Sequence, residues 1–206
     1  GVPPKQARRE SVAFTNAWKA RYETKIRQLN AVARRNDAEF ASFTEKMFRR
    51  LYHEAFHAYL ANYVYPPQDH HVPRWLNEGL AQVFEAGRIE ADTLRLDAPS
   101  VQLLRALQAD LKEADRMDIA DLLVADERTY LDSHAESGSS VRHYYYAWGL
   151  AYYLTFEHAA LNTKSMHEYV GSASSDTSPV ERFESLVGMP LSHFEQLWQE
   201  KMLSLK

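Results

Sequence analysis

Apolar residues recur at every third or fourth position through the first sixty residues, which is the spacing of one face of an α-helix. The pattern predicts a helix over residues 6–36 and a second helix over residues 38–63, which Pro66 and Pro67 end. The apolar stripe of the first helix consists of Val12, Trp18, Tyr22, Ile26 and Leu29. The amino-terminal third of the chain is therefore expected to be helical.

The rest of the chain shows the same helical spacing in shorter segments. Pro73 is typical of a helix start and Gly87 of a helix end, so a third helix is expected over residues 74–87. Ser100 can cap a helix that runs to Ala114. The other expected helices cover residues 118–125, 143–160, 179–187 and 191–203.

Strand signals are confined to residues 88–97, where Leu94 and Leu96 alternate with polar residues. Residues 132–142 are polar and rich in Gly and Ser, which predicts a mobile loop; its action as a lid is a hypothesis. The sequence thus predicts a mainly α fold with at most a small β element. One domain is expected over residues 1–206, made of an amino-terminal helix (1–36), a helix hairpin (38–87) and a mostly helical remainder (88–206).

Composition sets the outer limits. Hydrophobic residues make up 45% and aromatic residues 12% of the 206-residue chain, which is enough for a real core. No apolar run approaches the ~20 residues that a membrane-spanning helix needs. The chain contains no cysteine, so it gives no evidence on disulfides in either direction. It starts at Gly1 without Met and without a signal-peptide pattern, which indicates a trimmed chain or a mature fragment and leaves open the removal of a signal or anchor. A periplasmic, secreted or membrane-tethered location is then favoured.

Charge is unevenly distributed along the chain. Residues 1–50 carry 12 Lys or Arg against 5 Asp or Glu, whereas the remainder carries 12 against 23. A basic arm of this kind can bind nucleic acid or anionic lipid. Because the charges follow a helical pattern, a solvated face, or packing against the acidic remainder, is the favoured explanation. No nucleic-acid partner is expected.

The candidate chemistry begins at the segment His53-Glu54-Ala55-Phe56-His57. Residues four apart lie on one face of a helix, so His53 and His57 can both reach a single metal ion. Glu54 lies about 100° further round the helix, which is unfavourable for a ligand. It is well placed to take a proton from a water on the open side of the ion, as a general base.

A third ligand is expected from Glu78, in the segment Trp75-Leu76-Asn77-Glu78-Gly79-Leu80-Ala81. Twenty residues separate Glu78 from His57, which is enough for a helix, a reversal and a returning helix. Two imidazoles and one carboxylate, with one open position, form the ligand set of a catalytic zinc. Asn77 and Glu85 are candidates to accept a hydrogen bond from the imidazole nitrogen that does not bind the metal, which would orient the rings.

Together these residues resemble the gluzincin metallopeptidases, in which His-Glu-x-x-His is followed by a downstream Glu. The segment from Trp75 to Ala81 is very similar to the corresponding segment of the zinc aminopeptidases related to aminopeptidase N, and the whole chain looks more like the small bacterial peptidase MA-like proteins. The resemblance implies a zincin-like fold, one Zn²⁺ held by His53, His57 and Glu78, and Glu54 as the catalytic carboxylate. It covers residues 47–87 strongly and residues 143–154 more weakly.

The resemblance also implies a tyrosine that stabilises the oxyanion of the tetrahedral intermediate. Tyr146-Ala147-Trp148-Gly149 fits the Tyr-x-x-Gly pattern of the family, which makes Tyr146 the candidate and His143 a neighbour that could support the site. Two features of the family are missing. No Gly-x-Met-Glu-Asn segment is present, so the resemblance does not support aminopeptidase activity. No strand precedes the histidine helix in residues 1–52, and only residues 88–97 offer a substitute.

Three functional classes follow from these residues. The first is a zinc metallopeptidase acting on a peptide or protein substrate, which the presence of Glu54 favours. The second is a catalytically inactive, zinc-bearing binding or scaffold domain of the same fold. The third is a helical interaction module without metal, which requires both motifs to be accidental.

Overall fold

The computed structural model describes residues 3–126, 129–130, 138–171 and 177–206. Its internal contacts group the chain into two compact units, residues 1–48 and residues 49–206, where the sequence predicted one domain. The first unit is helix throughout its described residues, so the contacts within it run between neighbouring turns of that helix. All the residues of the candidate metal site lie in the second unit.

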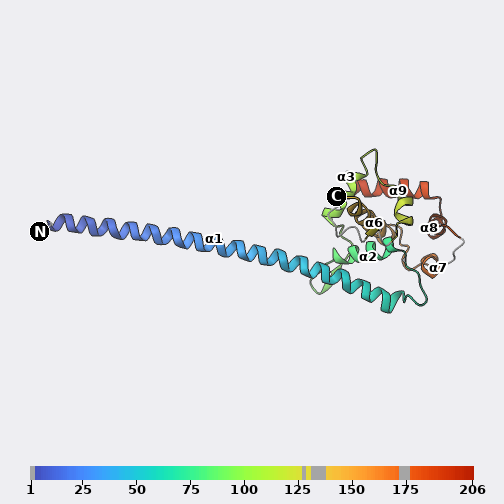
Figure 1. Cartoon of the computed structure of the whole chain (residues 1–206), viewed down its shortest axis with the longest axis horizontal. Coiled ribbons are helices and arrows are strands. Elements are labelled where there is room, and N and C mark those ends of the chain that lie inside the picture. The colour runs from blue at the N-terminus through green and yellow to red at the C-terminus, as the bar shows by residue number, and fades with distance from the viewer. Residues whose placement is uncertain (1–2, 127–128, 131–137, 172–176) are drawn as a thin grey trace. The chain divides into compact units, whose positions relative to one another are not determined.

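A single helix, α1, spans Pro4–Tyr59 and continues as one π-helical segment, η1 (Leu60–Val64) (Figure 1). The expected break near residue 37 is wrong. No Gly or Pro occurs between residues 5 and 65, and the polar pair Asn36-Asp37 carries only a small propensity penalty inside a helix. The apolar residues predicted to form a stripe in the first unit, such as Trp18 and Leu29, have exposed side chains.

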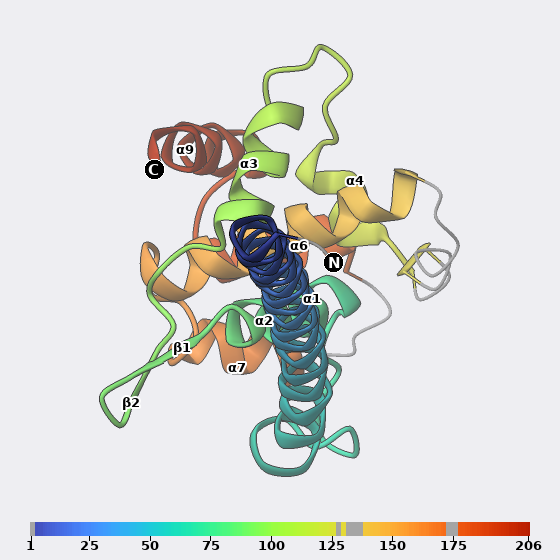
Figure 2. The same ribbon diagram turned by 90° about the vertical axis from the view of Figure 1, so that its left-hand side faces the viewer.

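Seven shorter helices and one hairpin follow among the described residues. The helices are α2 (Arg74–Glu85), α3 (Val101–Asp110), α4 (Ile119–Val124), α6 (Gly138–Phe156), α7 (Lys164–Gly171), α8 (Pro179–Val187) and α9 (Leu191–Ser204). Strands β1 (Arg88–Glu90) and β2 (Thr93–Arg95) pair antiparallel, with Ile89 opposite Leu94 (Figure 2). Ala91 and Asp92 join them with φ angles of 46° and 62°, the left-handed values that a two-residue hairpin turn requires.

Helix α6 is the centre of the second unit. Its residues from Tyr145 to Tyr152 are all buried, because α2, α3, α4 and α9 pack around it. The approach to α2 is close: a Cβ atom on Gly79 would lie 2.2 Å from the carbonyl oxygen of Ala147. The largest fully buried side chains are aromatic and include Trp75, Trp148, Trp198, Tyr146, Phe183 and Phe194.

The helices of the second unit largely follow the predicted segments. The Oγ atom of Ser100 accepts from the Leu103 amide and caps α3, as expected, and α8 has the predicted bounds. The mainly α fold is confirmed. The predicted loop lies outside the described residues at 131–137, whereas residues 138–142 are helical. Within the described part of the chain, no helix combines the length and the hydropathy that crossing a bilayer requires.

Candidate metal centre

The histidine pair lies near the end of α1, where the helix has uninterrupted backbone hydrogen bonds. His53 and His57 are one turn apart, and their rings meet edge to face with centroids 4.7 Å apart. Both rings are partly buried, with 16% and 23% of their side-chain surface exposed. The helical spacing predicted from the sequence therefore brings the two imidazoles together on one face.

Helix α2 brings Glu78 to the same place. Trp75, Leu76 and Leu80 anchor one side of α2 in the core, and Gly79 allows the close contact with α6. The Glu78 side chain is only 3% exposed; its Oε2 atom lies 3.4 Å from Nε2 of His53, and its Oε1 atom lies 3.7 Å from Nε2 of His57. One potential ligand atom from each of the three residues falls within 4.8 Å of the others.

These distances match the demands of a tetrahedral ion. Ligand atoms ~2.0–2.1 Å from a zinc at tetrahedral angles stand roughly 3.4 Å from one another. The His53–Glu78 distance of 3.4 Å equals this spacing and the His57–Glu78 distance of 3.7 Å is slightly longer. The two distances run to different oxygens of Glu78, and one ligand atom from each residue lies within 4.8 Å of the other two.

The Nδ1 atom of each imidazole ring has a hydrogen-bond partner on α2. The Nδ1 atom of His53 lies 3.1 Å from Oε2 of Glu85, and the Nδ1 atom of His57 lies 2.9 Å from Oδ1 of Asn77. Since both partners accept hydrogen bonds, each Nδ1 is the donor and each Nε2 faces Glu78. Asn77 and Glu85 therefore lie where the sequence predicted, on the helix that also carries Glu78.

The contacts within the group shift the pKa values of His53 and Glu78. Burial opposes charge on His53, but the hydrogen bonds to Glu78 and Glu85 outweigh it and raise the pKa of His53 from 6.5 to about 9. Burial also opposes the ionisation of Glu78, yet its contact with His53 and the charges of Arg74 and His57 lower its pKa. The cluster thus holds an ionised carboxylate beside a proton that a metal cation can replace.

Arg74 is a partner of Glu78 that the sequence reasoning missed. Its Nη2 atom lies 2.9 Å from Oε1 of Glu78, one helical turn away in α2. The i, i+4 spacing of an Arg and a Glu on one helix was the available signal, but such pairs are common on solvated faces and carry no specificity.

Glu54 lies beside the ligand group and outside it. Its side chain is 57% exposed, and Oε1 lies 3.5 Å from Nη2 of Arg50. One residue after His53, it projects from a different part of the helix surface, as the 100° rotation per residue requires. The position fits a group that serves the open side of a metal site.

The structure does not bring Tyr146 to the ligand group. Its hydroxyl is fully buried and donates to Oδ2 of Asp110 at 2.8 Å, and Asp110 is also held by two hydrogen bonds from Arg142. Burial, and then the hydrogen bond to Asp110, raise the pKa of the phenol. Tyr146 faces this charged pair because α6 packs against α3 on that side. The prediction missed this because helix periodicity does not specify which side of α6 meets α3.

A different tyrosine lies in the electrostatic reach of the site. Tyr130 is 1% exposed, and its pKa is raised first by burial and then by the charge of Glu78. Its ring packs edge-on against His143 and against Tyr144. No motif pointed to Tyr130, because the segment that carries it has neither helical periodicity nor ligand spacing.

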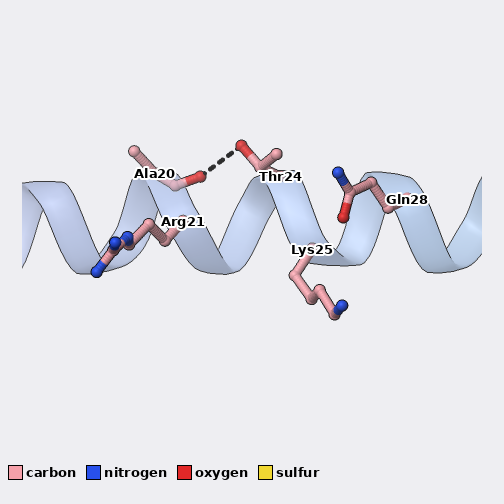
Figure 3. Close-up of a pocket in the computed structure, with 5 residues that line it drawn as sticks. All are labelled: Ala20, Arg21, Thr24, Lys25 and Gln28. Carbon is pink, nitrogen blue, oxygen red and sulfur yellow. Dashed lines mark hydrogen bonds between the residues drawn. The ribbon is translucent and has the colours of Figure 1, made fainter.

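A cavity of about 260 Å³ adjoins the ligand group. His57 and Asn77 form one side, and the turn after α1 contributes the rest of the lining, including Tyr65, His70, His71 and Val72. His70 and His71 are thus wall residues and do not join the group that can hold a metal. Figure 3 shows another hollow, formed by Ala20, Arg21, Thr24, Lys25 and Gln28. All five belong to one stretch of α1, so that hollow is a surface groove between side chains.

Residues 48–181 match a family model described as "Protein of unknown function (DUF1570)". The match covers more than half of the chain and includes both histidines, Glu54 and Glu78. Neither the curated proteins nor the solved structures include a significant match to the chain.

Proposed function

We propose that the chain, which belongs to the DUF1570 family, is a zinc-dependent hydrolase of peptide bonds with a zincin-like site of the gluzincin type. One observation carries the proposal: His53, His57 and Glu78 each offer a ligand atom, and the three atoms lie within 4.8 Å of one another. The resemblance of both motifs to metallopeptidase sequences supports the same activity.

The donor set fits Zn²⁺. Two imidazole nitrogens and one carboxylate oxygen are typical ligands of catalytic zinc, and structural zinc sites are mostly built with cysteine, which this chain lacks. Three protein ligands leave one coordination position for water or substrate. Partners on both Nδ1 atoms fix the ring orientations, which raises the basicity of the Nε2 donors.

A bound zinc ion supplies Lewis acidity and lowers the pKa of a coordinated water to roughly 7. Glu54 then acts with its carboxylate: it accepts a proton from the attacking water and passes it to the nitrogen of the leaving amine. Its 57% exposure leaves the carboxylate accessible to a water molecule or a substrate.

The cavity beside His57 and Asn77 gives the substrate a place. At about 260 Å³ it can take one amino-acid side chain next to the bond to be cut, with apolar and histidine walls. The proposed substrate is a peptide or protein, as the resemblance of the motifs to metallopeptidase sequences implies. Tyr146 enters the proposal only as a structural residue, because its hydroxyl is bound to Asp110.

A catalytically inactive zinc-bearing binding domain is the second candidate. One observation favours it: the strands among the described residues, β1 and β2, are three residues long, which leaves little edge for pairing with the backbone of a substrate.

Peptide hydrolysis by the zinc-loaded protein, measured beside Glu54→Gln, tests the proposal. We expect a loss of ~10²–10⁴-fold in turnover with zinc content unchanged, since an amide cannot accept the proton. Glu168→Gln is the matched control, because Glu168 also pairs with a basic residue four positions away on an exposed helix face. Full activity of Glu54→Gln contradicts the mechanism, and an inactive wild-type protein with one zinc supports the second candidate.

A further inference from the structure

Helix α2 begins with a residue that is electrostatically unfavourable there. Arg74 is its first residue, and its first turn contains no acidic side chain. The amino-terminal end of a helix carries partial positive charge, so a cation at this position opposes the helix dipole. The helix dipole therefore does not favour an arginine at this position, and the i, i+4 ion pair with Glu78 is the contact that favours it.

The contact that Arg74 makes is specific to one oxygen atom. Its Nη2 atom lies 2.9 Å from Oε1 of Glu78, an ion pair with a side chain that is 3% exposed. The other oxygen, Oε2, lies 3.4 Å from Nε2 of His53, which is close to the roughly 3.4 Å that separates two ligand atoms of a tetrahedral zinc. Nε2 of His57 lies 3.7 Å from Oε1, so Arg74 is the nearer neighbour of that oxygen and His53 the nearer imidazole of the other.

From this division of the carboxylate we infer that Arg74 is a positioning residue, which holds Oε1 of Glu78 so that the carboxylate binds zinc through Oε2 alone. The inference rests on the proposed metal site. A carboxylate that binds through both oxygens would occupy an additional coordination position beside the two imidazoles. With Oε1 retained by Arg74, the ion keeps three protein donors and an open position for water or substrate.

The arginine also has the right shape for this task. Its guanidinium is planar and stays charged at any working pH, so it places a rigid cation beside Oε1 where a lysine would act only as a flexible point charge. About a third of its side chain remains exposed (33%), whereas Glu78 is enclosed. If Arg74 is removed, Oε1 keeps only the neighbouring imidazole of His57 at 3.7 Å, and the freed oxygen is expected to turn to the metal.

Cobalt(II) in place of zinc reports the coordination number directly, because four-coordinate Co²⁺ absorbs visible light much more strongly than five-coordinate Co²⁺. We expect the wild-type protein to give the intense four-coordinate spectrum and Arg74→Met to give the weak five-coordinate one. Zinc affinity of the variant, measured by competition with a chromophoric chelator, is expected to fall by about 10-fold or more, as for other residues that orient a metal ligand.

Arg142→Met is the matched control. Arg142 also bonds a carboxylate, that of Asp110, at 2.8 Å and 3.1 Å, but Asp110 is not among the candidate ligands. This variant should lose thermal stability and keep both the wild-type cobalt spectrum and the wild-type zinc affinity. If Arg74→Met does not fold, Arg74→Gln, which fills part of the same space without the charge, takes its place.

The outcomes separate this inference from the proposed function. A folded Arg74 variant with the wild-type spectrum and affinity overturns the role of Arg74 and leaves the metal site standing. A folded wild-type protein that binds neither Co²⁺ nor Zn²⁺ overturns the metal site itself.

Discussion

The Nδ1 atom of His57 donates to Oδ1 of Asn77 at 2.9 Å, and Asn77 is the residue immediately before Glu78. One turn of α2 therefore supplies both a candidate metal ligand and the group that orients another candidate ligand on α1. The same helix reaches His53 through Glu85. The metal site thus depends on α2 as a rigid unit, and its members should respond together to changes in that helix.

Asn77→Ala should weaken zinc binding, because the ring of His57 loses the acceptor that fixes its orientation. A loss of ~10–100-fold in affinity is typical for such partners, measurable by chelator competition. Asn77→Asp keeps an acceptor oxygen and should stay close to the wild type. Equal affinity of Asn77→Ala and wild type would show that the contact does not orient the ligand.

The metal-free protein should lose stability as the pH rises. His53 has a pKa of about 9 in the folded state against 6.5 unperturbed, so its stabilising contribution is complete below pH 6.5 and disappears as the pH rises through about 9. Thermal unfolding of chelator-treated protein should therefore show a falling Tm over this window. His53→Gln should remove that part of the dependence; an identical slope in the variant contradicts the assignment.

Tyr146→Phe should affect stability far more than activity. The substitution removes a buried hydrogen bond to the ionised Asp110, which is worth about 1.5–3 kcal/mol in free energy of unfolding. Urea unfolding measures this loss, and peptide hydrolysis measured on the same samples should stay near wild type. A drop of 100-fold in turnover with unchanged stability would instead place Tyr146 in the reaction.

Gly79→Ala should disrupt the packing of α2 on α6. The new methyl group would lie 2.2 Å from the carbonyl oxygen of Ala147, so the two helices must move apart. We expect a loss of about 3 kcal/mol in free energy of unfolding, at the upper end of typical overpacking costs, together with weaker zinc binding. Gly171→Ala is the control, because nothing lies within 4 Å of its added Cβ; similar losses in both variants would rule out the close contact as the cause.

Local periodicity was sufficient to predict which candidate residues of one helix share a face. The spacing of His53 and His57 on one helix determines that their rings share a face. Glu78 and Glu85 are seven residues apart, so they too lie on one side of their helix and can face the same pair of rings. These relationships depend on helix geometry, which a sequence pattern specifies directly.

The sequence pattern did not predict how elements that are distant in the chain pack against one another. Tyr146 was expected at the metal site and instead bonds Asp110 of α3, because the packing of α6 against α3 decides which side of α6 faces which neighbour. Burial and then the charge of Glu78 raise the pKa of Tyr130, which lies in a segment without any motif. The uninterrupted α1 was also missed: helices were predicted over residues 6–36 and 38–63, although no Gly or Pro separates them.

Zinc content of the reconstituted protein is the most direct test of the account. After treatment with a chelator, incubation with Zn²⁺ and removal of free metal, elemental analysis should find one zinc per wild-type chain and none in His57→Ala or Glu78→Ala. Folded wild-type protein that retains no zinc would contradict the claim that His53, His57 and Glu78 hold a metal ion together.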